Sequence, residues 1–340
     1  MRNKAALPLL AFGAGVLLAY GATRRNRLYD LKNKNVLITG GSRGLGFALA
    51  REFALRGSHV TVCARDANEL REAANLLERD GLQINTMTCD ITQEADVEAL
   101  VRELETKNGP VDVLVNNAGR IEVGPLETTT IQDYEKAMAT HFWGPLFFMQ
   151  AALPGMVRQD AGRIVNISSI GGKIGVPHLT PYSGSKFALA GLSEAVAAEV
   201  RKNNIFVTTV YPGLMRTGSP CNANFKGQHH KEYTWFTLSD STPLITIAAV
   251  RAARKIVHAC QSGRASLVIT PAAKLAVLAH ALMPETLINA LSLVNRLLPK
   301  AGGIGSNTAK GRDSQTLLTR SPLTILTKRA AAELNQMSGT

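Results

Sequence analysis

The sequence contains few cysteines, few aromatic residues and a modest share of charged residues. Four of its 340 residues are cysteines, and no two of them form a C-x-x-C pair. This scarcity argues against a disulfide-stabilised scaffold and against a four-cysteine zinc site, and it fits a reducing compartment. Aromatic residues make up 5% of the chain and are not interleaved with basic residues in any stretch. Nucleic-acid binding, which uses such stretches, is therefore not indicated.

Hydrophobic residues, in contrast, make up 45% of the chain, which argues against general disorder. The length of 340 residues is enough for one large domain with a sizeable core, or for two ordinary domains. The formal net charge is +12, of which +6 lies in residues 1–34 and +3 in residues 301–340. The excess positive charge is therefore terminal, and the intervening chain has a charge balance typical of a soluble domain.

A long uncharged run lies near the N-terminus. Residues 5–22 contain no charged side chain, and as a helix they would span about 27 Å, close to the roughly 30 Å hydrocarbon core of a bilayer. Basic residues at 24–27 resist translocation. We therefore predict a single-pass membrane anchor over residues 1–25, with the rest of the chain in the cytoplasm. Two alternatives stay open, a signal peptide cleaved near the small-x-small triplet 19–21 and a buried helix.

Short apolar runs alternate with amphipathic segments from residue 35 onward. The apolar runs are typical of strands and lie at 36–39, 59–62, 84–87, 111–115, 163–167 and 206–210. The amphipathic segments are typical of helices and lie at 45–56, 67–80, 92–106, 131–158 and 183–202. This alternation predicts an α/β fold, with a doubly wound, Rossmann-like parallel sheet covered by helices on both faces.

A glycine-rich loop follows the first predicted strand and opens the first predicted helix. Its glycines have the spacing G-x-x-x-G-x-G, at Gly40, Gly44 and Gly46. Glycines at such a turn let the backbone approach a pyrophosphate, and the helix N-terminus supplies N–H donors and the positive end of its dipole. The loop in this context predicts a dinucleotide site.

Three further motifs occur in order along the chain. They are Asn116-Asn117-Ala118-Gly119 after the fourth strand, Tyr182-x-x-x-Lys186 with Ser169 thirteen residues earlier, and Tyr211-Pro212-Gly213 followed by Thr217. With these motifs the chain resembles the short-chain dehydrogenase/reductase family from about residue 34 to about residue 270. The resemblance implies an NAD(P)-binding oxidoreductase domain over residues 30–270 that interconverts a carbonyl and a secondary alcohol.

The resemblance also assigns the residues that contact the cofactor. They are Gly40, Ser42, Arg43, Gly44, Leu45, Gly46, Arg65, Asp90, Ile91, Asn117, Ala118, Gly119, Tyr182, Lys186, Pro212, Gly213 and Thr217. Asp90 is expected to contact the adenine, and Asn117 is expected to line the ribose region.

The end of the second strand bears on the choice between NADP(H) and NAD(H). An acidic residue there favours the free ribose of NAD(H), whereas a cation accommodates the 2′-phosphate of NADP(H). The strand ends in Arg65 and Asp66, and Arg43 lies in the glycine loop. Because arginine pairs well with a phosphate dianion, we favour NADP(H). An inward-pointing Asp66, and arginines that only face solvent, are the alternatives.

Ser169, Tyr182 and Lys186 form the predicted catalytic group. Tyr182 and Lys186 are four residues apart at the start of a predicted helix, so they share a face. An ammonium about 4 Å from the phenol is worth about 4 kcal/mol at an effective dielectric constant of about 20, so we expect Lys186 to lower the pKa of Tyr182. Tyr182 would transfer the alcohol proton, and Ser169 would hydrogen-bond the carbonyl oxygen. The resemblance also assigns Lys186 to the nicotinamide ribose.

His141 departs from the family pattern. The family usually has an asparagine at this position, within N-x-x-G, where it supports a relay of water and protons. His141 is therefore either a packed core residue or an imidazole that holds the same water. The pair His229-His230 has no acidic or cysteine partner at ligand spacing, so we assign it to a loop and predict no metal site.

The last seventy residues lie outside the resemblance. Residues 271–300 carry leucines at helical spacing, interrupted at Pro284, and predict an apolar helical extension. Residues 301–340 predict a flexible basic tail. The apolar face of the extension is either a core or subunit-contact face, which leaves a homo-oligomer open, or a membrane-surface helix beside the active site.

These features predict a membrane-anchored, NADP(H)-dependent oxidoreductase whose substrate is a lipophilic carbonyl or alcohol of lipid, steroid or acyl type. A nucleotide-binding scaffold of the same fold, with weakened catalysis, is the alternative. Such a scaffold would be expected to lack Tyr182 or Lys186, and both are present.

Overall fold

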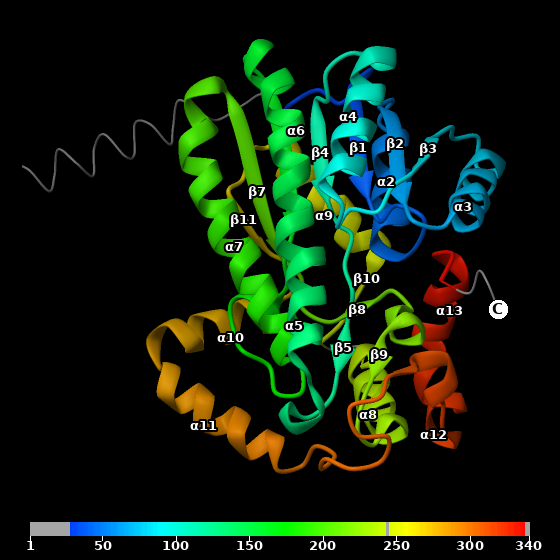
Figure 1. The fold of residues 1–340 in the computed structure, drawn as a ribbon, viewed down its shortest axis with the longest axis vertical. Coiled ribbons are helices and arrows are strands. Elements are labelled where there is room, and N and C mark those ends of the chain that lie inside the picture. Colours follow the sequence, from blue (N-terminus) through cyan, green and yellow to red (C-terminus); the bar gives the residue numbers. More distant parts are fainter. Residues whose placement is uncertain (1–27, 243–244, 337–340) are drawn as a thin grey trace, which may run out of the picture.

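The computed structural model describes residues 28–242 and 245–336 (Figure 1). Its centre is a seven-stranded sheet with the order β11-β7-β6-β4-β1-β2-β3, in which every strand pair is parallel. The strands are β1 (Asn35–Thr39), β2 (His59–Ala64), β3 (Asn85–Thr88), β4 (Val113–Asn116), β6 (Gly162–Ile167), β7 (Ile205–Tyr211) and β11 (Ser266–Val268). Strands β4 and β6 consist wholly of buried residues, as expected where helices cover both faces of a parallel sheet.

The predicted α/β class, with a doubly wound Rossmann-like sheet, is confirmed. Six of the seven strands overlap the apolar runs expected from the sequence. Strand β11 is not expected from the sequence, because it has only three residues and begins with an exposed serine.

Helices cover both faces of the sheet. One face carries α2 (Gly44–Ala54), α3 (Ala67–Arg79) and α9 (Ala249–Gln261), and the other carries α4 (Glu94–Asn108), α6 (Gly144–Arg158) and α7 (Thr180–Val200). Phe53 and Ile256 are fully buried on the first face, and Phe148 and Met156 on the second. Burying one such side chain contributes about 1.5–3 kcal/mol, so these two layers form the core.

The strand order reverses at β1, which pairs with β2 on one side and with β4 on the other. In open parallel sheets the ligand crevice lies outside the carboxyl ends of the strands at this point. The glycine loop follows β1, and the motif at 116–119 closes β4. The fold therefore brings both motifs to the crevice.

The helix expected over residues 131–158 contains a change of helix type. Helix α5 (Ile131–Met138) begins with a capping box between Thr130 and Asp133. A π-helical turn, η2 (Ala139–Trp143), then leads into α6. Such turns are frequent at functional sites. This one contains His141.

Short elements lie beyond the carboxyl ends of the sheet strands. They are β5 (Glu122–Val123), β8 (Met215–Arg216), β9 (Asn224–Phe225), α8 (His229–Ser241), β10 (Ile247–Ala248) and β12 (Ala309–Lys310). Strands β12, β9 and β5 form one small sheet, and β10 pairs with β8. The pair His229-His230, expected in a loop, forms the first turn of α8 instead.

The extension expected over residues 271–300 consists of α10 (Pro271–Leu282) and α11 (Pro284–Asn295), which meet at Pro284. Figure 1 shows both helices, in orange, at the margin of the molecule. No residue of α11 is buried. Leu275, Leu282 and Leu297 are 69%, 70% and 84% exposed. The extension therefore presents an apolar surface.

Residues 301–340 are expected to form a flexible tail, but as far as residue 336 the structure shows regular secondary structure in this segment. This segment contains β12, α12 (Leu317–Arg320) and α13 (Ile325–Glu333), and Ser314, Thr324 and Leu334 are buried. Figure 1 shows α12 and α13, in red, beside α8. The sequence misleads because its Gly, Ser and Thr residues are typical of loops. Here the hydroxyl groups cap short helices, as Thr316 does in the capping box of α12.

The membrane anchor predicted over residues 1–25 lies outside the described residues. Within residues 28–242 and 245–336, no helix is both long enough and apolar enough to cross a membrane.

Candidate active site

The glycine loop between β1 and α2 has a tight conformation that depends on glycine. Gly40 and Gly44 have φ angles of +64° and +60°, in the left-handed region that glycine adopts without strain. At Gly46 a Cβ atom would lie 2.0 Å from the carbonyl oxygen of Gly40 and 2.6 Å from Asn117 Nδ2. That amide nitrogen donates to the carbonyl oxygens of Thr39 and Gly40, both at 3.0 Å. Asn117 therefore holds the loop in place.

The N-terminus of α2 is suited to an anion. Its N-cap residue, Arg43, forms no side-chain cap hydrogen bond, and the first turn contains no acidic residue. The N–H groups at a helix start carry partial positive charge. Leu45 and Gly46 lie in this turn, so the donors and the shape of the loop fit the pyrophosphate of a dinucleotide.

Glu69, on α3, connects the glycine loop after β1 to the helix that follows β2. Its two carboxylate oxygens accept hydrogen bonds from Ser42 Oγ at 3.1 Å and from the Arg43 guanidinium at 2.6 Å. Asp66 is the N-cap of α3 and accepts from the N–H groups of Asn68 and Glu69. Both of these hydrogen bonds are to the Oδ1 atom of Asp66, so this carboxylate has a structural role as a helix cap. Arg65 is exposed, and it forms no ion pair within the described residues.

The other predicted cofactor residues also lie at the carboxyl edge of the sheet. Asp90 and Ile91 follow β3, Ala118 and Gly119 follow β4, and Pro212, Gly213 and Thr217 follow β7. One carboxylate oxygen of Asp90 accepts from the N–H and the hydroxyl of Thr92. The hydroxyl of Thr217 is buried and accepts from the N–H of Ser219 at 3.2 Å. These bonds hold the two turns in fixed positions beside the glycine loop.

The structure brings Ser169, Tyr182 and Lys186 together at the carboxyl end of β6. Ser169 caps the short helix η3 (Ile170–Gly172), where its Oγ accepts from the N–H of Gly171 at 3.1 Å, and it lies close enough to Tyr182 to lower the pKa of the phenol. Lys186 lies one turn after Tyr182 in α7, with its Nζ 5.7 Å from the centroid of the Tyr182 ring. The same Nζ donates to the carbonyl oxygen of Ile167 at 2.7 Å. The three residues therefore form one cluster beside the cofactor crevice.

The electrostatics of this cluster differ from the expectation. Burial raises the pKa of Tyr182, the hydrogen bond with Ser169 opposes that shift, and the charge of Asp240 adds to it. Burial also lowers the pKa of Lys186 to about 7. The prediction that Lys186 lowers the pKa of Tyr182 is therefore wrong for this structure, because removal from water outweighs the effect of Ser169 and Lys186 makes no resolved contribution. Tyr182 is protonated at neutral pH.

The contacts of His141 distinguish between its two interpretations. Its Nε2 accepts a hydrogen bond from the N–H of Arg120 at 3.1 Å, and its Nδ1 is 2.8 Å from Ser185 Oγ. Burial lowers the pKa of His141 well below its usual value, so the ring is neutral. Both nitrogens are therefore occupied, and the ring edge packs against Tyr182 at 5.4 Å between centroids. This geometry favours a packed residue that positions α7 over one that holds a relay water.

Sequence reasoning missed Asp240, on the buried face of α8. It is 4% exposed, and burial raises the pKa of its carboxyl group to about 8. Its charge acts on Tyr182, and its helix neighbour Phe236 belongs to the same apolar cluster as Tyr182. The sequence carries no signal for this residue, because a single aspartate on a helix of mixed polarity resembles any surface acid.

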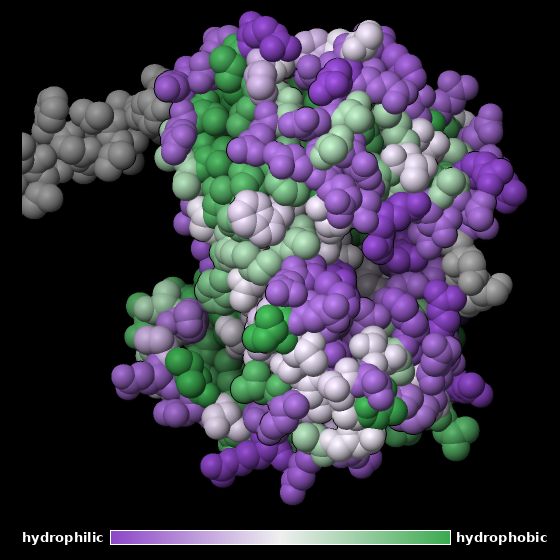
Figure 2. Space-filling view, in the orientation of Figure 1, coloured by the Kyte–Doolittle hydropathy of each residue, from purple (hydrophilic) through white to green (hydrophobic). Residues whose placement is uncertain are grey.

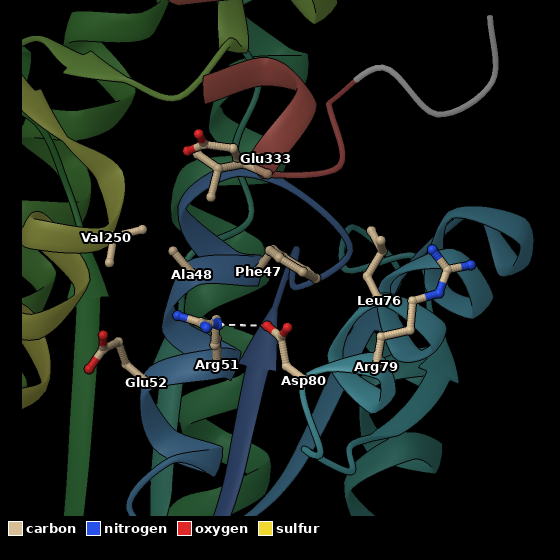
Figure 3. Close-up of a pocket in the computed structure, with 10 residues that line it drawn as sticks. Phe47, Ala48, Arg51, Glu52, Leu76, Arg79, Asp80, Val250 and Glu333 are labelled. Atoms are coloured by element: carbon tan, nitrogen blue, oxygen red, sulfur yellow. Dashed lines mark hydrogen bonds and ion pairs between the residues drawn. The ribbon is translucent and has the colours of Figure 1, made fainter. Parts of the chain in front are cut away.

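A separate hollow of about 360 Å³ lies on the outer side of α2 (Figure 3). It is lined by residues of α2, α3, α9 and α13, among them Arg51 and Asp80, which form an ion pair at 3.0 Å. None of the predicted catalytic or cofactor residues lines it. Within the described residues no cluster of His, Cys, Asp and Glu is arranged to hold a metal ion.

Comparison with known proteins agrees with this geometry. The profile of the short chain dehydrogenase family matches residues 34–225. The chain belongs to the short-chain dehydrogenase/reductase family. This dehydrogenase/reductase is therefore an oxidoreductase whose fold binds NAD(P), and its glycine loop and Ser-Tyr-Lys cluster lie where the fold places the crevice.

Individual relatives of this dehydrogenase/reductase show how far the similarity extends. A 3-ketodihydrosphingosine reductase of Mus musculus is 35% identical over 54% of this chain and 56% of its own length. A short-chain dehydrogenase from Streptomyces avermitilis has a TM-score of 0.65 at 30% identity, over 77% of this chain and 98% of its own. An L-sorbose reductase from Gluconobacter frateurii, solved with NADPH and L-sorbose, has a TM-score of 0.63 at 25% identity, over 70% of this chain and 95% of its own.

The buried carboxyl group of this dehydrogenase/reductase leads to a prediction about stability. The pKa of Asp240 is about 8 in the folded protein, against about 4 in an unfolded chain. Between these two pH values the folded state keeps a proton that the unfolded state has lost. The free energy of unfolding therefore falls as the pH rises through this range, by at most about 1.4 kcal/mol per pH unit. We expect urea unfolding to show that the wild type loses stability relative to Asp240→Asn over this range. A difference that does not change with pH would contradict the assignment.

Proposed function

We propose that this protein is an NADP(H)-dependent reductase that converts a lipophilic ketone into a secondary alcohol. The observation that carries the proposal is the convergence of Ser169, Tyr182 and Lys186 beside the glycine loop. A scaffold without catalysis would have no need of this arrangement. The protonated state of Tyr182 suits reduction, because that direction requires a proton donor at the start of the reaction.

The residues of the cluster have distinct proposed roles. A bound nicotinamide would supply the hydride. Ser169 Oγ hydrogen-bonds the substrate carbonyl oxygen and orients it toward the Tyr182 hydroxyl, which donates the proton. Lys186 lies one helical turn away and would hydrogen-bond the nicotinamide ribose of a bound cofactor. His141 positions the start of α7 through Ser185, whose hydroxyl donates to the carbonyl oxygen of Tyr182 at 2.8 Å.

The ends of β1 and β2 support the choice of NADP(H). Arg43 and Arg65 provide cations near the end of β2. Of the two acids beside them, Asp66 caps α3 and Glu69 pairs with Arg43. The similar L-sorbose reductase was solved with NADPH. We therefore propose that these arginines would bind the 2′-phosphate of NADP(H).

The exposed apolar helices support a lipophilic substrate. Thr270 and Ala273, at the start of α10, lie against Gly213 in the turn after β7, where a Cβ at Gly213 would be 2.7 Å from Thr270 Oγ1. Figure 2 shows hydrophobic residues gathered over α10 and α11. One relative is named as a reductase of 3-ketodihydrosphingosine, a long-chain ketone. We propose that α10 and α11 contact a lipid surface and that residues 5–22 anchor the chain to it, which carbonate extraction of membranes would test.

A series of ketones of increasing chain length tests the proposed substrate class. Each methylene that reaches apolar protein surface contributes up to about 0.8 kcal/mol, or roughly 4-fold in kcat/KM. We expect NADPH consumption to become more efficient with each added methylene until the site is filled. Turnover of small polar carbonyls alone would contradict the proposal, and faster turnover with NADH than with NADPH would contradict the cofactor assignment.

A further inference from the structure

The C-terminal part of the chain returns to the cofactor site and is attached there at two places. We call residues 309–336 the C-terminal strap. At its start, β12 pairs antiparallel with β9, Lys310 opposite Asn224, and the N–H of Gly311 donates to the carbonyl oxygen of Ala223 at 2.9 Å. Strand β9 pairs in turn with β5, which begins just after the motif at 116–119. The strap thus begins beside one wall of the crevice.

The other end of the strap is hydrogen-bonded to the glycine loop itself. The carbonyl oxygen of Leu334 accepts from the N–H of Gly44 at 2.8 Å. Asn335 Nδ2 donates to the carbonyl oxygen of Ser42 at 3.0 Å, and Gln336 Oε1 accepts from Asn222 at 2.7 Å. Figure 3 shows α13, with Glu333 at its end, lying across the first turn of α2. The position of the strap is therefore coupled to that of the loop.

Lys310 joins a group of arginines around the crevice. Partial burial lowers the pKa of Lys310. The positive charges of four nearby arginines lower it too, namely Arg120, Arg43, Arg312 and Arg65. Arg43 is paired with Glu69, and Arg120 with Glu122 at 2.8 Å. Lys310 forms no ion pair or side-chain hydrogen bond within the part of the chain that the structure describes. It is exposed, so an anion can reach it.

Glu69 and Glu122 offset two of the arginines, but no carboxylate of the described residues pairs with Lys310. An ammonium beside like charges is destabilised until an anion binds it. The cluster lies at the loop that fits a pyrophosphate and includes both arginines assigned to the 2′-phosphate. A crease separates the part of the molecule that contains the sheet from the part that contains α8 and α12. Figure 2 shows hydrophilic residues on both sides of this crease. The substrate carbonyl, in contrast, belongs at Tyr182, which is packed in an apolar cluster. A phosphate group of the cofactor is therefore the anion that this position suits.

We propose that Lys310 binds a phosphate group of the dinucleotide cofactor, and that the C-terminal strap holds it there. The inference rests on the proposed NADP(H) site and adds to it a residue from outside the segment that matches the family profile. Asn335 is then a positioning residue, because it fixes the strap to the glycine loop without contacting the cofactor.

The test compares the dissociation constants of NADPH and NADH for the full-length protein and three variants. A hydrogen bond between an ammonium and a phosphate contributes more binding free energy than a neutral hydrogen bond. We therefore expect Lys310→Gln to weaken NADPH binding by about 10- to 100-fold. Lys328→Gln is the matched control, because Lys328 is an exposed lysine of the same strap that is absent from the arginine cluster. It should change the affinity by less than about 2-fold. Asn335→Ala should weaken binding to an intermediate degree.

The two cofactors separate the possible phosphates. If Lys310→Gln loses affinity for NADPH alone, Lys310 binds the 2′-phosphate. If it loses affinity equally for NADH, Lys310 binds the pyrophosphate. Either result supports the proposal. The melting temperature of the cofactor-free Lys310→Gln variant should not fall, whereas a purely structural lysine would lower it. If the wild type prefers NADPH and Lys310→Gln binds it with unchanged affinity, this inference is overturned while the proposed function stands. A wild type that binds neither cofactor would overturn the proposed function instead.

Discussion

Replacing Tyr182 with phenylalanine is expected to lower kcat for ketone reduction by about 10²- to 10⁴-fold, the range that a positioned acid contributes. The substitution removes only the hydroxyl group, which lies beside Ser169 and is kept protonated by burial. The ring remains, so its packing against His141 and the shape of the crevice are retained. Steady-state kinetics with NADPH and the best ketone of the chain-length series would measure the change.

A matched variant separates this effect from a general loss of a buried hydroxyl. Tyr29 donates to Asp112 Oδ1 at 3.3 Å at the opposite, amino end of the sheet. Tyr29→Phe should therefore keep nearly full activity. Titration of NADPH should show that Tyr182→Phe still binds the cofactor, because the glycine loop and Lys186 are unchanged. If Tyr182→Phe kept wild-type turnover, another group would be the proton donor.

The second large effect is expected at Ser169. Removing one donor to a developing oxyanion typically costs about 10²- to 10³-fold in kcat, and we expect Ser169→Ala to fall in this range. The loss should appear in kcat more than in KM, because the bond to the carbonyl oxygen strengthens as negative charge develops on that oxygen. Ser169 also accepts from the N–H of Gly171 at 3.1 Å, so a modest fall in stability should accompany the change.

Two measurements keep these effects apart. Ser262 is an exposed serine at the end of α9, and Ser262→Ala should leave both activity and stability unchanged. The thermal midpoint of Ser169→Ala would report the lost cap, while single-turnover rates at saturating substrate would report the chemical step. A variant that lost stability but kept its single-turnover rate would show that Ser169 supports η3 and does not contact the carbonyl oxygen.

Much of the sheet can be predicted from the sequence because its strands are buried on both faces and therefore appear as continuous apolar runs. β1 and β6 are examples. β11 has three residues, and its position depends on pairing with β7 rather than on its own composition. The strap is unpredictable for a related reason. Its Ser and Thr residues resemble those of a loop, and the partners that order them lie far away in the sequence.

The candidate site divides in the same way. The glycine loop, Ser169, Tyr182 and Lys186 are detectable because each occupies a position with a required spacing. Asp240 and Lys310 have no such spacing, since only the folded chain brings α8 to Tyr182 and β12 to the arginines. The direction of the Tyr182 pKa shift is also misjudged from sequence, because spacing shows a nearby lysine and says nothing of how thoroughly both groups are removed from water.

The bond between Asn335 and Ser42 also has a consequence for biosynthesis. It joins positions that are 293 residues apart. At about 5–20 residues per second, a ribosome needs roughly 15–60 s after finishing the glycine loop to produce the residues that secure it. Most of the sheet is synthesised in that interval, so the emerging chain can fold its core before the cofactor site is complete. A nascent chain arrested before residue 309 would expose the loop and helix α2 without the segment that covers them, and on the proposal above it would hold a dinucleotide firmly only after residues 309–336 had been synthesised.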